Sequence, residues 1–428
     1  MATLTKDLEF RGLIHQVTDP SLPVLLDSGY LVAYIGFDPT ADSLHVGHLL
    51  QLCNLRRLQM GGHRPIAVAG GGTAVVGDPG GRSEERSMLD DEQIKRNLEG
   101  ILPQLEKLLD FSTGAGKSQA LLVNNGDWLQ PVGLLEFLRE VGKHFSVNQM
   151  VTKESVKARL ERPDQGISFT EFSYMLLQAY DFLHLFDSFE CRLQLGGSDQ
   201  WGNITMGIEL IRKLRRVEAY GLTTPLVLKP DGTKFGKTAT GTVWLDARRT
   251  SPYQFFQYFL RVEDSVVCDY LRRLTFLDHD AIRQLDVLTA DKPGERQAQR
   301  ALAREMCKMM HGAAETERAE KASAALFSEE ISTLDEETLL QVFAEVPTTV
   351  MSRSLLDDSG LPVLNALVEV GLCASRNQAR TAIEQGGAYV NNRRVESTEA
   401  TLRREDLLQD RYVVLRRGRR DYHLVRFE

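Results

Sequence analysis

Two short apolar segments with one amphipathic stretch between them constrain the fold of this chain more than any other feature. Residues 31–37 (LVAYIGF) end at an Asp-Pro turn pair, and residues 65–76 (PIAVAGGGTAVV) run into a glycine-rich loop. Between them, residues 43–62 repeat apolar side chains with helical spacing and end at a Gly-Gly pair. Strand, helix and strand with glycine-rich loops after the strands are typical of a doubly wound parallel sheet. We therefore predict an α/β fold whose ligands bind beyond the carboxyl ends of the strands.

Further elements follow along the chain. Residues 132–160 have helical spacing with a break near Gly142. Residues 191–204 (CRLQLGGSDQWGNI) predict a third strand that enters a glycine loop and then a helix. Residues 224–245 predict two strands around a loop of glycine, lysine and threonine, and residues 251–327 predict helix after helix.

The length of 428 residues is too great for one hydrophobic core, so we predict several domains. They are a Rossmann-like domain over residues 1–246 with a helical insertion at about 130–170, an α-helical domain at 247–327, an acidic, proline-bearing linker at 328–358, and a small α+β domain at 359–428. In the last domain Ser375 is a candidate helix N-cap, and residues 411–427 predict a two-stranded hairpin.

The composition excludes several classes of protein. Hydrophobic residues at 42% and charged residues at 26% are ordinary for a globular chain, and no apolar run approaches the ~18–20 residues of a membrane span. The first residues, MATLTKDLEFRG, are charged where a signal peptide is apolar. The five cysteines are scattered without a CxxC pair, which favours a reducing compartment and argues against structural zinc. We expect a cytoplasmic protein without membrane contact.

Charge is distributed unevenly along the chain. The net charge is −8, yet residues 361–428 hold 12 Arg, no Lys and 9 acidic residues, a balance of +3, which leaves −11 for the rest. An arginine-rich tail on an acidic body indicates either a local anionic partner or a solvated surface.

Two polar motifs carry candidate chemistry. His45 and His48 flank Gly47 in SLHVGHLL, and Lys234 and Lys237 lie in GTKFGKT. The histidines suit a metal, a phosphate or packing, but no third and fourth metal ligand is evident in the sequence. GTKFGKT lacks the spacing of a Walker loop, although a cationic loop suits the charge on a polyphosphate leaving group. A solvated surface turn is the alternative.

Taken together, the motifs resemble those of the bacterial tyrosyl-tRNA synthetases, which are class I aminoacyl-tRNA synthetases. Residues 34–49 (YIGFDPTADSLHVGHL) resemble the first signature of that family, and residues 234–238 (KFGKT) resemble the second. Residues 172–182 (FSYMLLQAYDF) and 196–204 (GGSDQWGNI) resemble stretches that line the tyrosine and ribose pockets. The resemblance runs from about residue 8 to residue 328, and the tail resembles an RNA-binding module shared with a ribosomal protein.

This resemblance implies a tyrosine–tRNA ligase that activates L-tyrosine with ATP and transfers the tyrosyl group to the 3'-terminal ribose of tRNA(Tyr). ATP is then a substrate that arrives with Mg2+ held by its phosphates and water, and no bound prosthetic group is expected. The family further implies a homodimer joined through the helical insertion, with tRNA bound by the helical domain and the tail.

The resemblance also assigns site residues. Catalytic contacts to the phosphates fall on Thr40, His45, His48, Arg82, Arg86, Lys234, Lys237 and Thr238. Tyrosine contacts fall on Tyr34, Asp78, Tyr174, Gln178, Asp181 and Gln200, with Tyr34 and Asp181 reading the substrate hydroxyl. ATP contacts fall on Gly36, Asp38, Gly47, Gly197 and Asp199, supported by Thr73 and Asn125. A pocket built around a substrate hydroxyl rejects the analogue that lacks it by ~10⁴–10⁵.

The chain departs from the family pattern at Ile35, at residues 70–76, at Arg82 and at Gly126. One hypothesis is a divergent second copy with altered sensitivity to tyrosyl-adenylate analogues. Two other functions stay open: an RNA-binding protein that has lost catalysis, and a tryptophan-specific relative. The intact histidines and lysines argue against the first, and the Tyr34–Asp181 pair argues against the second.

Overall fold

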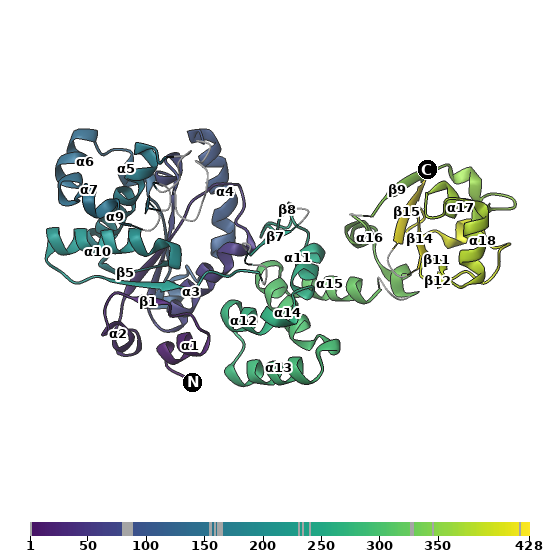
Figure 1. Ribbon diagram of the computed structural model, residues 1–428, viewed down its shortest axis with the longest axis horizontal. Helices are drawn as coiled ribbons and strands as arrows, with labels where there is room; N and C mark the ends of the chain where they lie inside the picture. Colours follow the sequence, from purple (N-terminus) through teal and green to yellow (C-terminus); the bar gives the residue numbers. More distant parts are fainter. Residues whose placement is uncertain are drawn as a thin grey trace. The chain divides into compact units, whose positions relative to one another are not determined.

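The computed structural model describes residues 2–78, 89–153, 156–157, 160, 166–229, 232, 235–238, 241–325, 329–344, 346–418 and 421–428, and of Asp91, Lys237 and Thr238 it describes the backbone alone. The chain forms two compact units (Figure 1). The first comprises residues 1–250 with 259–310, and the second comprises residues 251–258 with 311–428. No helix in the described part of the chain is both long and apolar enough to span a membrane.

A six-stranded sheet in the order β1-β6-β5-β2-β3-β4 organises the first unit. Its strands are β1 (Gln16–Val17), β2 (Val32–Phe37), β3 (Arg64–Ala69), β4 (Leu121–Asn124), β5 (Cys191–Gly197) and β6 (Tyr220–Thr224). All neighbours are parallel except β1 and β6. The chain moves outward through β3 and β4 on one side of β2 and through β5 and β6 on the other, so a topological switch point lies between β2 and β5. The predicted doubly wound fold is confirmed.

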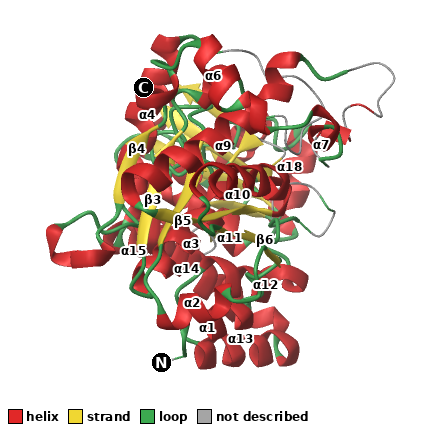
Figure 2. Ribbon diagram, turned by 90° about the vertical axis from the view of Figure 1, so that its left-hand side faces the viewer, coloured by secondary structure: helices red, strands yellow, loops and turns green. Residues whose placement is uncertain are grey.

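Helices cover both faces of this sheet, which explains why the central strands are almost continuously apolar. The helices are α1 (Leu4–Phe10), α2 (Leu22–Ser28), α3 (Leu49–Met60), α4 (Asp91–Glu106), α5 (Gly126–Leu129), α6 (Leu134–Glu140), α7 (Val147–Met150), α9 (Phe169–Phe189) and α10 (Trp201–Arg215). Helices α9 and α10 pack together over one face (Figure 2). Their core includes Val32 and Tyr34, which alternate along β2 with side chains of the opposite face.

Local outcomes follow the residue types. The helix predicted over residues 43–62 begins only at Val46, as a 3-10 turn (Val46–His48) that leads into α3. The strand predicted from Thr224 was wrong, because β6 lies at Tyr220–Thr224 and stops before Pro225, which has no N–H to donate. After it, β7 (Lys237–Thr238) and β8 (Gly241–Thr242) form a two-stranded pair.

The predicted helical run is confirmed. It consists of α11 (Pro252–Leu260), α12 (Asp264–Leu274), α13 (His279–Asp291), α14 (Gln297–His311) and α15 (Ala313–Ala325). Helices α12 and α13 belong to the first unit, and α15 belongs to the second.

The second unit has a five-stranded sheet in the order β12-β11-β14-β15-β9. Its strands are β9 (Thr348–Met351), β11 (Ala388–Val390), β12 (Arg393–Arg394), β14 (Tyr412–Arg417) and β15 (Asp421–Phe427). Beside it lie α17 (Val363–Glu369), α18 (Arg376–Glu384) and the pair β10 (Leu361–Pro362) and β13 (Thr401–Leu402). The hairpin of β14 and β15 confirms the prediction, as does Ser375, whose hydroxyl caps α18 by accepting from the Gln378 N–H.

The linker prediction for residues 328–358 is corrected where the chain is described. These residues contain α16 (Glu336–Val342) and strand β9, which pairs in parallel with β15. Ile331, Leu339 and Phe343 are buried in one core with Val414 and Leu424. The segment is acidic because its outer face is exposed, while these few apolar side chains dock on the sheet.

Candidate active site

The candidate site lies at the carboxyl ends of the parallel strands, beside the switch point. Asp38 follows β2, Thr73 and Asp78 follow β3, and Asp199 follows β5. Helix α9 adds Tyr174, Gln178 and Asp181, which the spacing i, i+4 and i+7 places on one face.

Asp181 is the most deeply buried carboxyl of the site, with 4% of its surface exposed. Its Oδ2 accepts a hydrogen bond from Asn125 Nδ2 (2.9 Å), and its Oδ1 accepts one from the Trp128 indole (2.8 Å). Burial raises the pKa of Asp181 to about 7, and the charge of Asp38 adds to this effect, while the two hydrogen bonds oppose it.

Tyr34 lies in the same core, with 2% of its surface exposed and its ring edge-on to Phe182. Its hydroxyl is buried and has no hydrogen-bond partner among the described residues. Burial raises the pKa of Tyr34 well above its usual value, and the neighbouring charge of Asp181 raises it further. A buried hydroxyl without a partner is unfavourable, so this group is available to a ligand hydroxyl.

A chain of hydrogen bonds links Asp181 to the end of β2. The Asn125 amide that binds Asp181 also donates to Thr73 Oγ1 (3.0 Å). The Thr73 hydroxyl donates to Asp38 Oδ1 (2.9 Å), and the Tyr174 hydroxyl donates to Asp38 Oδ2 (3.2 Å). One polar network thus joins helix α9 to residues that follow β2, β3 and β4.

A second network joins α9 to the loop after β5. Gln178 Nε2 donates to Gln200 Oε1 (3.3 Å), and Gln200 Nε2 donates to Asp78 Oδ2 (2.7 Å). Asn203 Nδ2 donates to both Gln178 Oε1 (3.1 Å) and Gln200 Oε1 (3.2 Å). Asp78, Gln178 and Gln200, which the resemblance assigns to tyrosine, therefore lie close together.

His45 and His48 lie close together at the start of α3. They are not two positions of one helix, because His45 precedes the turn and only His48 belongs to it. His45 is the extended N-cap of the turn, and the two rings stack with centroids 4.0 Å apart. The Gly47 N–H donates to His45 Nδ1, and the His45 N–H donates to His48 Nδ1, each at 3.1 Å. Because both Nδ1 atoms accept, a neutral ring carries its proton on Nε2 and can donate it to an anion.

The described part of the second signature lies against this turn. A Cβ on Gly236 would come within 2.6 Å of Val46 Cγ2, and the Gly47 position lies beside the Phe235 carbonyl. The Val243 N–H donates to the Gly236 carbonyl, and the Val46 N–H donates to the Val243 carbonyl. The two signatures, separated by about 190 residues, are thus neighbours in space.

The remaining predicted residues are placed as follows. Thr40, Gly36 and Asp199 are exposed at the strand ends, and Gly197 is buried. Arg82, Arg86 and Lys234, and the side chains of Lys237 and Thr238, lie outside the described residues. Among the described residues, no group of three or more His, Cys, Asp or Glu side chains could hold a metal ion.

Sequence reasoning missed Trp128 and Asn203, which bind Asp181 and Gln178. Trp128 had no signal in the sequence, because it reads as an apolar side chain of a short helix and its partner lies 53 positions away. Asn203 falls inside the GGSDQWGNI stretch, so that motif could have indicated it.

Comparisons with known proteins agree with this fold. A family model described as tRNA synthetases class I (W and Y) matches residues 27–328, and one described as Tyrosine--tRNA ligase SYY-like C-terminal domain matches residues 338–425. The fold and the site therefore define a class I aminoacyl-tRNA synthetase.

The names of similar proteins identify one family within this class. A protein named Tyrosine--tRNA ligase from Roseiflexus castenholzii is 50% identical over 426 residues, with 100% of both chains covered. Its namesake from Geobacillus stearothermophilus is 46% identical, with 99% of each covered. The crystal structure of a C-terminally truncated mitochondrial tyrosyl-tRNA synthetase from Aspergillus nidulans superposes with a TM-score of 0.68 at 32% identity, covering 76% of this chain and 95% of that one. This chain belongs to the tyrosine–tRNA ligase family.

Proposed function

We propose that this chain joins L-tyrosine to tRNA(Tyr) in two steps at the site described above. First, a carboxylate oxygen of tyrosine attacks the α-phosphorus of ATP in line, and pyrophosphate leaves to give tyrosyl-adenylate. The carboxylate is ionised at pH 7, so no general base is needed, and catalysis comes from positioning and from charge stabilisation. Second, the 3'-terminal ribose hydroxyl of tRNA attacks the tyrosyl carbonyl, and AMP leaves.

The observation that carries the proposal is the pair of buried polar groups on β2 and α9. The Tyr34 hydroxyl has no partner among the described residues, and the Asp181 carboxylate keeps lone pairs beyond the two bonds it accepts. A substrate phenol would accept from Tyr34 and donate to Asp181. Phenylalanine would leave both groups unsatisfied, which is the basis for rejecting it.

The rest of the amino acid would be held by the two polar networks. We assign the substrate ammonium to Asp78, Tyr174 and Gln178, whose oxygens can accept its hydrogens. Gln200, at the N-terminus of α10, is assigned to the carboxylate.

The phosphates would lie at the start of α3. His45 and His48 can donate from Nε2, Thr40 is exposed after the end of β2, and a helix N-terminus favours anions. From the resemblance we assign Arg82, Arg86, Lys234, Lys237 and Thr238 to the leaving pyrophosphate. Magnesium would arrive with ATP, held mainly by phosphate and water.

The nucleoside contacts are proposed from the strand ends. Gly36, Asp38, Gly47, Gly197 and Asp199 would line the ribose and adenine. A Cβ on Gly197 would lie 2.5 Å from Asp199 Oδ1, so glycine there keeps that carboxylate in place.

We propose a homodimer joined through the helical insertion at about residues 130–170. Leu134 and Leu135 on α6 are 72% and 81% exposed, and Phe169 at the start of α9 is 78% exposed. Apolar exposure on this scale within one segment favours an interface. Sedimentation of Leu135→Glu should show monomers, whereas Val24→Glu, at an exposed valine of α2, should remain dimeric. A dimeric Leu135→Glu would contradict the assignment.

We assign tRNA(Tyr) to the helical domain and the arginine-rich second unit. The Arg416 guanidinium lies 3.7 Å from the centroid of the Tyr389 ring and 5.6 Å from that of Tyr422, an arrangement that can present a planar cation to RNA. The cytoplasm is the proposed site of action.

ATP–pyrophosphate exchange with tyrosine, phenylalanine and tryptophan in turn tests the proposal. Exchange with tyrosine alone is expected. Exchange with tryptophan would favour the tryptophan-specific reading, and no exchange would favour an RNA-binding protein without catalysis.

The family departures at Ile35, residues 70–76, Arg82 and Gly126 support a separate proposal, a divergent second copy with altered inhibitor sensitivity. Inhibition by a non-hydrolysable tyrosyl-adenylate analogue should differ between this protein and the Geobacillus stearothermophilus relative. Equal inhibition constants would contradict it.

A further inference from the structure

Tyr270 of α12 contacts the segment that carries the second signature at two points. The Tyr270 side chain is buried, and its hydroxyl donates to the Leu228 carbonyl (2.8 Å), ahead of the motif. Its ring meets the Phe235 ring edge-on, with centroids 4.8 Å apart. Phe235 lies inside KFGKT, between Lys234 and Lys237 in the sequence.

Phe235 is itself held from two sides. Its buried ring also packs against Phe259 of α11, with centroids 6.2 Å apart. On the other side, the next residue, Gly236, packs against Val46. Gly236 has a φ of 89°, and a Cβ there would overlap the valine. The described part of the second signature is therefore wedged between α12 and the first signature.

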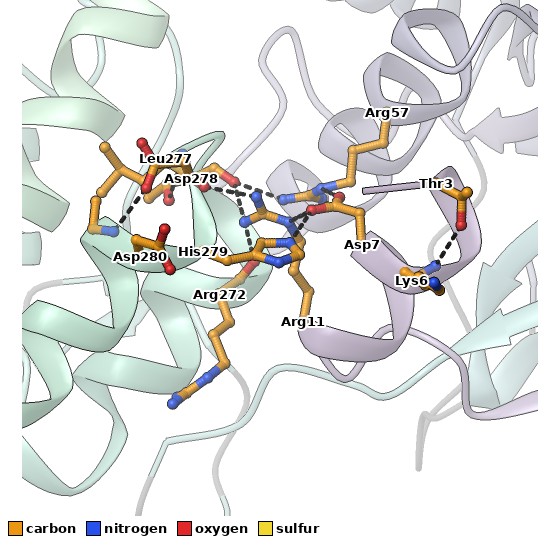
Figure 3. A network of polar contacts seen from close by, with 12 residues as sticks. Thr3, Lys6, Asp7, Arg11, Arg57, Arg272, Leu277, Asp278, His279 and Asp280 are labelled. Atoms are coloured by element: carbon orange, nitrogen blue, oxygen red, sulfur yellow. Dashed lines mark hydrogen bonds and ion pairs between the residues drawn. The ribbon is translucent and has the colours of Figure 1, made fainter. Parts of the chain in front are cut away.

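Helix α12 is in turn fixed to α3 and to the end of α1 by two buried guanidinium groups (Figure 3). Arg57 of α3, 3% exposed, donates to the Thr275 carbonyl (2.8 Å) just beyond the end of α12. Arg11, the C-cap residue after α1, is 4% exposed and donates to the carbonyls of Arg272 (2.9 Å), Thr275 (3.0 Å) and Leu277 (2.7 Å). These bonds satisfy carbonyls at and just beyond the end of α12, so α12 cannot shift against α3 or α1 without losing them.

We infer that Tyr270 is a positioning residue for the step that releases pyrophosphate. Helix α3 carries His45 and His48 at its start and holds α12 near its end, and α12 holds Phe235 through Tyr270. The backbone between the two lysines is thereby set at a fixed place relative to the histidines. The inference rests on the proposed function, in which the lysines act on the leaving group of ATP. Since pyrophosphate has left before tRNA is charged, Tyr270 matters for adenylate formation and its reversal and has no part in the transfer to tRNA.

The test compares Tyr270→Phe and Phe235→Leu with the unaltered full-length protein. Loss of one hydrogen bond predicts that Tyr270→Phe lowers kcat for ATP–pyrophosphate exchange about 3- to 10-fold, with the KM for tyrosine unchanged. Phe235→Leu should lower it at least as much. Transfer from preformed enzyme-bound tyrosyl-adenylate to tRNA, measured in a single turnover, should keep its rate in both variants. Tyr412→Phe is the matched control, because it removes a buried tyrosine hydroxyl that binds Glu336 (2.9 Å) in the second unit.

Two results would overturn the inference. One is unchanged exchange in both variants. The other is an equal fall in exchange and in single-turnover transfer, which would indicate a general loss of structure. Should Tyr270→Phe not fold, Phe235→Leu decides by the same comparison. No exchange by the unaltered protein would instead refute the proposed function, on which the inference depends.

Discussion

Burial raises the pKa of Asp181 to about 7, so this carboxyl titrates within the range where the reaction would be assayed. The ionised form is the one that accepts from the substrate phenol. Below pH 7 its fraction falls about tenfold per pH unit, so kcat/KM for tyrosine should fall with the same slope. Asp181→Asn should have a lower kcat/KM without this slope. Trp128→Phe removes a donor that favours the ionised form, so the midpoint should move to higher pH. A profile of the unaltered protein that is flat between about pH 5.5 and 8.5 would contradict this role.

The Gly47 position leaves no room for a side chain while His45 keeps its place. A Cβ there would lie 2.8 Å from His45 Cε1 and 2.9 Å from Nδ1, so Gly47→Ala must displace the ring. Misplacement of about 1 Å predicts a fall in kcat for exchange on the order of 10- to 100-fold, with the KM for tyrosine unchanged. Gly294→Ala is the control, because its added Cβ meets no atom within 4 Å. Normal exchange by Gly47→Ala would contradict this prediction, because the His45 ring could then move without loss of activity.

At the scale of elements, the junction of α3 and α12 depends on the shape of the Arg57 guanidinium. The planar guanidinium of Arg57 donates to the Thr275 carbonyl and to Asn54 Oδ1 from two nitrogens. Arg57→Lys keeps the charge, but a single ammonium group cannot make both bonds in this geometry. Opening the end of α12 should become easier by about 2 kcal/mol. Amide hydrogen exchange over residues 271–278 should then be about 30-fold faster. Arg248→Lys, at an 81% exposed side chain bonded to Asp246, should leave exchange there unchanged. Equal amide protection over residues 271–278 in the two variants would contradict this role of Arg57.

Which elements could be predicted depended on whether the signal was local. The strands at 31–37 and 65–69 are apolar runs bounded by turns, and such runs are recognised without knowledge of their neighbours. Strand β6 (YGLTT) was missed because glycine and two threonines interrupt its apolar pattern, and Thr223 and Thr224 become buried only once β6 lies between β1 and β5. The residues of the site divide in the same way, into those with a local signal in the sequence and those without one. Its motif residues were found from resemblance, whereas the Trp128–Asp181 bond exists only once α9 has packed over the sheet.

At the scale of the whole molecule, the position of a truncation should decide whether the remaining protein is soluble. A chain that ends after residue 327 should retain tyrosine-dependent exchange and lose tRNA charging, because the arginine-rich residues 361–428 are gone. A chain that ends after residue 358 keeps Ile331, Leu339 and Phe343 without Val414 and Leu424 to cover them, and should aggregate. Light scattering and exchange assays on both proteins check this. A soluble, fully active product that ends at residue 358 would contradict the packing described for this segment.

The parallel pairing of β9 with β15 has a consequence for synthesis. Strand β9 ends at Met351, and its partner begins at Asp421, so the ribosome adds about 70 residues between them. At 5–20 residues per second, β9 waits roughly 4–14 s for β15, its one strand neighbour among the residues that the structure describes. During that interval its edge and the apolar side chains just before it are open to other nascent chains. Strand β1 of the first unit faces a longer wait, because its neighbour β6 begins at Tyr220, about 200 residues after Val17. Both units therefore leave an early strand edge that chaperones would have to protect during translation.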